Sequence, residues 1–429
     1  MRTSHIQTIE NPLQWKQKLL QWARQHEEVL WLDSNDYPDK YSSYDAILAV
    51  EAFTAIQTDH KDAFNKLKEY QETTRDWIFG YLSYDLKNDI EELTSENHDG
   101  LEFPELFFFQ PKKLFLLKGN RLEMQYLRMV DDEISEDLKD ILEVPEPDAP
   151  AGQRPAVRVH ARIGREEYLK RVKELQEHIH RGDIYEANFC QEFYAEGIEL
   201  DPMKTYQRLN SISFPPFAAF LRFGDRYLFS ASPERYIKKL GSQVITQPIK
   251  GTARRSEDPA EDRKIAEDLS RDEKERSENI MIVDLVRNDL SRTAAKGTVK
   301  VEELCEVYSF RQVHQLISTV SSTLAEGVSP VEILKTTFPM GSMTGAPKIS
   351  AMKLIEELEA SKRGLYSGAL GYFTPEGDLD YSVVIRSVVY DQKKKYASFS
   401  VGGAITAKSI PEKEYEECLL KAKAMRESL

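Results

Sequence analysis

The chain has 429 residues, of which 41% are hydrophobic and 30% are charged, and this composition is typical of a globular protein with two or three domains or one large α/β or α+β unit. The net charge of −14 opposes broad electrostatic binding to nucleic acid or to anionic lipid, so neither partner is expected. Three scattered cysteines, an N-terminus without an apolar core and the lack of an apolar run of about 20 residues favour a cytoplasmic protein without a membrane span.

The first 142 residues are expected to alternate helices with strands. Apolar side chains recur at near-helical spacing in the helical segments, and apolar runs that end in turn residues indicate the strands. We expect helices at 12–28 and 63–73, and strands at 29–36, 77–85 and within 104–127.

A proline-rich segment follows at residues 143–155. It contains four prolines and almost no apolar periodicity, as is typical of a linker. We therefore predict a boundary there, between an N-terminal region (1–142) and a second region (156–429).

The second region is expected to contain more antiparallel strands. The two-residue turns Gly224–Asp225 and Gly241–Ser242 each join two apolar runs, which predicts two consecutive hairpins. We expect helices at 165–182, 259–284, 302–308, 349–362 and 411–425, and strands at 184–197, 218–230, 235–249, 368–374, 379–390 and 396–405. Helices segregated against mostly antiparallel strands predict an α+β fold, and a doubly wound parallel sheet does not fit.

Lys250 lies between a strand that ends at Ile249 and a glycine that can turn the backbone sharply. We expect its side chain to project from a strand end, where active-site residues are often placed. A solvated turn lysine is the simpler interpretation of this stretch alone. Glu234 lies across the predicted hairpin and is expected to approach Lys250, either as part of a site or as a structural salt bridge.

Two helices each carry glutamates three residues apart, a spacing that places both side chains on one helical face. Two carboxylates 4 Å apart repel by about 4 kcal/mol at an effective dielectric constant near 20, so a converged set of four requires a cation or bound protons. Carboxylate oxygens are the ligands that Mg²⁺ prefers. Solvated helix faces are the alternative. The pairs are Glu275 with Glu278 and Glu414 with Glu417.

Further candidates lie near the C-terminus. Gly402 and Gly403 end a strand and allow backbone N–H groups to approach a carboxylate. Lys421 shares a helical face with Glu417, and Arg386 interrupts an apolar strand, as a pocket residue or as a cross-strand ion pair. His314 is interpreted as a satisfied core histidine on an apolar helical face.

Eight segments of this chain occur in the order found in the chorismate-utilising enzymes: SASPERY, PIKGTARR, SENIMIVDLVRNDL, GSMTGAPK, RGLYSGALGYF, VIRSVV, VGGAI and EKEYEECLLKA. The chain resembles that family strongly over about residues 160–429 and weakly before them. The resemblance implies the fold of anthranilate synthase component I, a large and mostly antiparallel β-sandwich with helices packed outside.

The resemblance also implies roles for the matched residues. The four paired glutamates would form a Mg²⁺ site that holds the ring carboxylate of chorismate. Glu234 would be the general acid that protonates the departing 4-hydroxyl. Lys250 would be the nucleophile that adds at ring carbon 2 before ammonia adds at carbon 4 and expels it. Substrate contacts are implied for Arg386, Tyr366, Gly402, Gly403, Lys421 and Thr252.

Within the family, the PIKGT form with Lys250 resembles component I of aminodeoxychorismate synthase, whereas anthranilate synthase component I has alanine there. The implied reaction converts chorismate and ammonia to 4-amino-4-deoxychorismate for p-aminobenzoate and folate synthesis. The chain resembles no glutaminase, so a separate glutamine amidotransferase subunit would supply the ammonia. The alternatives are anthranilate synthase component I and a non-catalytic chorismate-binding regulatory protein. Glu186 stands at the position where the ammonia-using members of the family usually have glutamine and the water-using members have lysine.

This chemistry requires a neutral Lys250 and a protonated Glu234. With an unperturbed pKa near 10.4, only about 1 lysine in 2,500 is neutral at pH 7. We expect burial to lower the pKa of Lys250 and to raise the pKa of Glu234.

Overall fold

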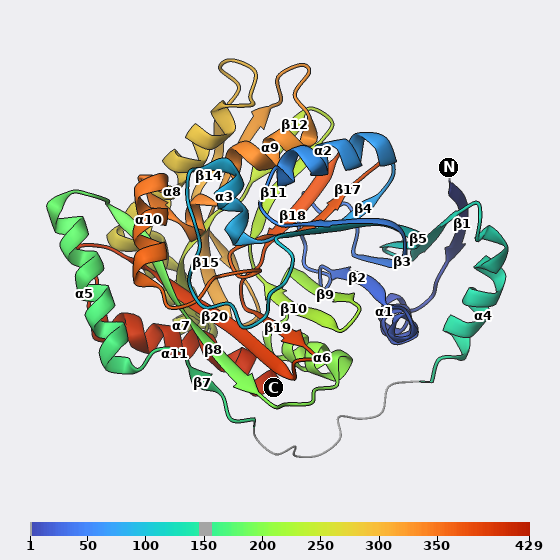
Figure 1. Ribbon diagram of the computed structural model, residues 1–429, viewed down its shortest axis with the longest axis horizontal. Helices are drawn as coiled ribbons and strands as arrows, with labels where there is room; N and C mark the ends of the chain where they lie inside the picture. The colour runs from blue at the N-terminus through green and yellow to red at the C-terminus, as the bar shows by residue number, and fades with distance from the viewer. Residues whose placement is uncertain (1, 146–156) are drawn as a thin grey trace.

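The computed structural model describes residues 2–145 and 157–429 (Figure 1). Within them, twenty strands are linked by antiparallel pairing into one network, and eleven α-helices surround it. The predicted α+β class is therefore confirmed. No helix in this part of the chain is long and apolar enough to cross a membrane.

The N-terminal elements, in chain order, are β1 Arg2–Thr8, α1 Pro12–Trp22, β2 Glu28–Asp33, β3 Ala46–Thr58, α2 Ala63–Thr74, β4 Ile78–Leu82, α3 Lys87–Ile90, β5 Leu106–Lys118, β6 Arg121–Leu127 and α4 Ile134–Glu143. Strand β3 was not predicted. Its first five residues are all buried, and a register shift interrupts its pairing with β5 between Ala52 and Thr54, so the sequence lacks a regular alternation.

The second half begins with β7 His160–Ala161, α5 Arg165–Arg181, β8 Glu186–Glu196, α6 Pro202–Ser213, β9 Phe217–Phe223, β10 Arg226–Ser232, β11 Arg235–Leu240, β12 Gln243–Thr246 and β13 Ile249–Arg254. It continues with α7 Pro259–Arg271, α8 Glu273–Ser291, β14 Lys300–Ser309, β15 Val313–Thr323, α9 Pro330–Thr337, β16 Gly345–Ala346 and α10 Lys348–Leu358. The last elements are β17 Ala369–Phe373, β18 Leu379–Val383, β19 Ser387–Asp391, β20 Tyr396–Ile405 and α11 Pro411–Ser428.

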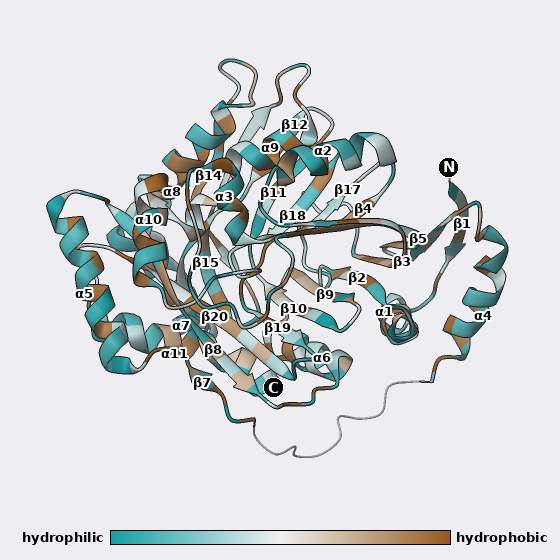
Figure 2. Cartoon of the chain, viewed as in Figure 1, coloured by the Kyte–Doolittle hydropathy of each residue, from teal (hydrophilic) through white to brown (hydrophobic). Residues whose placement is uncertain are grey.

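The core consists of three groups of buried apolar side chains. One group is formed by strands and loops alone, with residues such as Leu30, Phe109 and Leu221, and it fills the space between facing sheet surfaces. The other two groups join the outer sheet surfaces to helices. Helices α5, α10 and α11 lie at one end of the molecule and α1 and α4 at the other, and hydrophilic residues dominate the outer helices (Figures 1 and 2). The arrangement is the expected sandwich with helices outside.

Strand pairing crosses the boundary predicted between the two regions. β2 pairs with β9, and β4 pairs with β17. Most of the predicted linker, residues 146–155, lies outside the described residues, so the boundary stays a prediction.

Two helix predictions are wrong in this half. Residues 302–308 belong to β14, and His314 lies in β15, which pairs with β14. Two register shifts interrupt the β14 ladder, and Cys305 has a positive φ of 54°. These bulges break the two-residue alternation that identifies a strand, so the apolar spacing looked helical.

The predicted helix 259–284 is divided in two by Asp272. This residue is extended, and its side chain accepts a hydrogen bond from the Glu275 backbone N–H at 2.9 Å. Asp272 is thus the N-cap of α8, and it fixes where the helix that carries Glu275 and Glu278 begins.

Candidate active site

Lys250 lies at the start of β13 with its side chain only 11% exposed. Its Nζ donates a hydrogen bond to Oε1 of Glu186, on β8, at 2.8 Å. Gly251, the next residue, has a φ of +88°, and a Cβ there would lie 3.2 Å from Oε2 of Glu275. A turn that favours glycine therefore brings the lysine beside α8.

Glu234 lies in the short connection between β10 and β11 and is 5% exposed. Its Oε1 accepts a hydrogen bond from the Ser342 hydroxyl at 2.7 Å, and the Ile249 backbone N–H also donates to it. Burial raises the pKa of Glu234 to about 7, against the lowering effects of Ser342 and of the Lys250 charge. The direction of this pKa shift agrees with our expectation, and the Lys250 charge acts on this carboxyl group.

The pKa of Lys250 differs from our expectation. Burial does lower it, but the charge and hydrogen bond of Glu186, together with the charges of Glu278 and Glu234, outweigh burial and raise it above its usual value. The sequence shows that the lysine follows a strand but not that three carboxylates face it. In this structure Lys250 is an ammonium in an ion pair.

Glu275 and Glu278 of α8 are half-buried. Burial raises the pKa of Glu275, and it raises the pKa of Glu278 to about 7. Oε1 of Glu278 is buried and has no hydrogen-bond partner among the described residues. An unpaired buried carboxylate oxygen is costly unless a ligand or cation completes it.

The second pair of glutamates lies on α11, beside the glycines of β20. Glu414 is 8% exposed, and burial raises its pKa. Glu417 forms an ion pair with Lys421 at 2.6 Å, and Lys421 Nζ also donates to the Gly402 carbonyl at 3.0 Å. A Cβ on Gly403 would lie 3.4 Å from Glu414 Oε2, so strand and helix meet at this point.

The charges of the four glutamates influence one another and share a neighbouring cation. Glu417 raises the pKa of Glu275, and the charge of Lys274 acts on all four carboxylates. Lys274 Nζ lies 3.8 Å from Glu278 Oε1. Among the described residues, however, no three acidic, histidine or cysteine side chains are close enough to hold one metal ion. The donor type and the oxygen without a hydrogen bond fit Mg²⁺, and the long ion pair with Lys274 supplies part of the compensating charge.

Arg386 separates β18 from β19 and has a φ of +53°, which is unusual for a residue with a side chain. Its guanidinium has no hydrogen bond or ion pair with the part of the chain that the structure describes. Burial lowers its pKa, against the effects of Tyr366 and Glu417. Strained backbone and an unpaired, half-buried cation are typical of a residue kept for an anionic ligand. Tyr366, 7% exposed, lies beside it.

Thr252 is exposed, and its hydroxyl accepts a long hydrogen bond, 3.5 Å, from Gln315. The structure does not bring it into contact with the other predicted residues. Sequence reasoning missed Lys274 and Ser342. Lys274 lies four residues before Glu278, on the same helical face, which was a usable signal for one of the two pairs, whereas nothing in the sequence connects Ser342 with Glu234.

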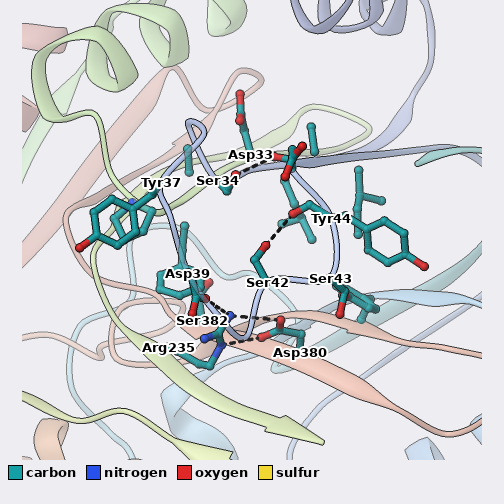
Figure 3. A pocket seen from close by; sticks show the side chains of 18 of the residues that line it. Asp33, Ser34, Tyr37, Asp39, Ser42, Ser43, Tyr44, Arg235, Asp380 and Ser382 are labelled. Atoms are coloured by element: carbon teal, nitrogen blue, oxygen red, sulfur yellow. Dashed lines mark hydrogen bonds and ion pairs between the residues drawn. The ribbon is translucent and has the colours of Figure 1, made fainter. Parts of the chain in front are cut away.

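A separate cavity, with an empty volume of about 600 Å³, is lined mainly by residues between 32 and 47 of the N-terminal region. Arg235, the next residue, lies at its edge and forms ion pairs with Asp39 at 2.7 Å and Asp380 at 3.1 Å (Figure 3). These contacts tie the N-terminal region to the segment that carries Glu234.

Gly402 lies where β20 and β8 approach closely. A Cβ there would lie 2.8 Å from the Cys190 Cβ and 2.9 Å from the Phe189 carbonyl oxygen. We expect Gly402→Ala to reduce the free energy of unfolding by about 1–3 kcal/mol, because the strand must move together with the carbonyl that accepts from Lys421. Urea unfolding measures the loss. Gly164→Ala, which meets no atom within 4 Å, is the control, and equal behaviour of the two variants would contradict this account.

An α+β chain that gathers a buried lysine, a buried acid, an unpaired arginine and four carboxylates has the features of a small-molecule enzyme. Residues 22–427 match the family described as chorismate binding enzyme, and the chain belongs to this family.

Two relatives illustrate the range of similarity. Anthranilate synthase component 1 of Thermus thermophilus is 38% identical over 356 residues, which cover 81% of this chain and 76% of the relative. Aminodeoxychorismate synthase component 1 of Salmonella typhimurium is 43% identical over 251 residues, 58% of this chain and 55% of the relative. The matched region thus spans about half of the second relative's length.

Solved structures confirm the fold. Anthranilate synthase component I from Streptococcus pneumoniae superposes with a TM-score of 0.79 at 28% identity, covering 91% of this chain and 94% of its own. The menaquinone-specific isochorismate synthase from Escherichia coli superposes with a TM-score of 0.77 at 16% identity, covering 100% and 95%, and shares the fold.

Proposed function

We propose that this chain is the chorismate-converting component of an aminodeoxychorismate synthase, a transferase that makes 4-amino-4-deoxychorismate from chorismate and ammonia. The observation that carries the proposal is Lys250. Its side chain is only 11% exposed, and it is paired with Glu186. Its charge also interacts with Glu234, whose pKa is about 7, and with Glu278 of α8. An amine placed there can act as a nucleophile.

The binding of chorismate follows from the charges around the site. Arg386 and Lys421 offer positive charge to the carboxylates of the substrate, and Gly402 and Gly403 leave room for close backbone contact. Glu275, Glu278, Glu414 and Glu417 would hold Mg²⁺ together with water and substrate oxygens, because no three of the described acidic side chains are close enough to ligate one ion by themselves. Bound there, Mg²⁺ would neutralise these side chains and attract the ring carboxylate of chorismate.

The reaction then needs one acid and one nucleophile. Glu234 gives its proton to the 4-hydroxyl, which leaves as water, because hydroxide itself is a poor leaving group. Lys250 Nζ forms a bond to ring carbon 2 in the same step. Ammonia next forms a bond to carbon 4 and expels the lysine, and the new ammonium returns a proton to Glu234.

Ammonia would come from a separate glutamine amidotransferase subunit, as the relatives named component 1 suggest. The three cysteines are free and buried, as suits a reducing cytoplasm, where we place the enzyme. Anthranilate synthase component I is the second candidate, because a relative of that name aligns over 81% of this chain.

Product identification separates the two candidates. The protein is incubated with chorismate, Mg²⁺ and ammonium, and the product is identified by chromatography and mass spectrometry. We expect 4-amino-4-deoxychorismate, with no loss of pyruvate. Fluorescent anthranilate would overturn the proposal in favour of the second candidate.

Mg²⁺ is expected to stabilise the folded protein, because a ligand that binds only the native state adds about 2.7 kcal/mol at a concentration of 100 times its Kd. Thermal unfolding with MgCl₂ or with EDTA measures the shift. Glu278→Gln should abolish most of it, whereas Glu273→Gln, an exposed residue of the same helix, should retain it. An equal shift in both variants would place the ion elsewhere.

A further inference from the structure

Glu186 is the one residue in direct polar contact with the Lys250 ammonium among the described residues, through a hydrogen bond of 2.8 Å. It is 1% exposed, and its second oxygen, Oε2, is buried with no hydrogen-bond partner in the described part of the chain. A buried carboxylate with one free oxygen has room to bind a proton. Solvent reaches this contact poorly, because only 11% of the Lys250 side chain is exposed, so Glu186 is the acceptor nearest to hand.

We infer that Glu186 accepts the proton that Lys250 must lose before it attacks chorismate. The inference rests on the proposed function, and it gives a catalytic role to the residue that pairs with Lys250. Glutamine can accept a hydrogen bond from the lysine but cannot take its proton.

The other carboxylates near Lys250 are already committed. Glu234 must keep its own proton for the departing hydroxyl, and it is hydrogen-bonded to Ser342. Glu278 and Glu275, on α8, act on the lysine through their charge without an ion pair to it. Glu186 therefore remains as the acceptor.

The backbone holds Glu186 in place from both sides. Glu186 pairs with Ala346 of β16, and the next residue of β8, Ala187, pairs with Ile405 of β20. The Tyr185 backbone N–H donates to the Ala346 carbonyl at 2.7 Å. A carboxylate fixed by a sheet is preorganised to meet the lysine without a reorganisation cost.

The protons balance through the cycle. Lys250 passes one proton to Glu186, so that a neutral amine faces a neutral acid when substrate closes the pocket and displaces water. The amine attacks carbon 2, and Glu234 protonates the leaving hydroxyl. When ammonia expels the lysine as a neutral amine, Glu186 returns the proton, and the ion pair of the free enzyme forms again.

The test compares Glu186→Gln with the unaltered protein in a single turnover without ammonia, by following the mass of the peptide that contains Lys250. Transfer inside an ion pair does not depend on solvent pH, so the unaltered protein should capture chorismate at a nearly constant rate between about pH 5.5 and 7. In the variant the amine must lose its proton to solvent, so the rate should rise about tenfold per pH unit. It should also be at least about 10²-fold lower at pH 6.5.

Two further variants support the comparison. Glu186→Asp keeps the proton acceptor and should keep the flat profile at a reduced rate. Glu192→Gln removes a buried carboxylate charge from the same strand, where Glu192 pairs with Arg162 at 2.9 Å, and should leave rate and profile unchanged.

A Glu186→Gln variant with a flat profile would overturn the inference, whatever its rate, because a purely structural role lowers the rate equally at every pH. That result leaves the proposed function intact as long as the unaltered protein makes 4-amino-4-deoxychorismate. If the unaltered protein makes only anthranilate, the proposed function fails by itself.

Discussion

Replacing Lys250 with alanine is expected to reduce the rate of 4-amino-4-deoxychorismate formation by about 10³-fold, equivalent to about 4 kcal/mol of transition-state stabilisation. The variant loses the covalent route and leaves ammonia to displace a poorly activated hydroxyl directly. Chorismate affinity should change much less, because Arg386 and Lys421 remain. Initial rates at saturating chorismate, with the product identified by mass spectrometry, measure the effect.

Stability needs a control in this experiment, because Lys250→Ala leaves Glu186 buried without its ion-pair partner. Breaking a buried pair in this way costs about 3–5 kcal/mol. Lys239→Ala is the matched variant: Lys239 is a buried lysine of β11, in the hairpin that precedes β13, and it is paired with Asp378 at 2.9 Å. It should lose stability but keep the activity of its folded fraction. Full activity in Lys250→Ala would show that Lys250 is not the nucleophile.

Replacing Glu234 with glutamine is expected to have two separate effects. Catalysis should fall by about 10²–10⁴-fold, because the amide cannot protonate the departing hydroxyl. Stability should change in a pH-dependent way. The folded protein holds the Glu234 proton with a pKa of about 7, against 4.5 as the ordinary value. Glu234 therefore favours the folded state less and less as pH rises from about 4.5 to 7.

The difference in unfolding free energy between Glu234→Gln and the unaltered protein should thus grow with pH. A shift of 2.5 pKa units corresponds to about 3 kcal/mol in favour of the variant at pH 8, relative to pH 4.5. Urea unfolding at both pH values measures it. Equal differences at the two pH values would mean that Glu234 is not held as a buried acid.

The strands and turns around Lys250 were predictable because their signals are local. Gly241–Ser242 joins two alternating runs, and the structure forms β11 and β12 there. The helix predicted at 165–182 is α5, and Gly182 follows it in the left-handed conformation common for a glycine at a helix end. Where the ladder contains bulges, as around Cys305, the local pattern misled us.

The site itself was predictable only in part. The glutamate spacing on α8 and α11 identified the helix faces, but it gave no hint that Lys274 would act on both pairs. The state of Lys250 depends on Glu186, 64 residues earlier in the chain. The fold brings the Lys250 side chain at the start of β13 to Glu186 at the start of β8, and this contact has no trace in the spacing of either strand.

Capture of chorismate on Lys250 tests the proposed reaction most directly. The protein is mixed with chorismate and Mg²⁺ without ammonia, digested, and analysed by peptide mass spectrometry, and a parallel sample is chased with ¹⁵N-ammonium. We predict that the Lys250 peptide gains the mass of chorismate less one water, and that the chase removes this adduct while labelled 4-amino-4-deoxychorismate appears. Formation of labelled product with no adduct on Lys250, or of labelled anthranilate, would contradict the account.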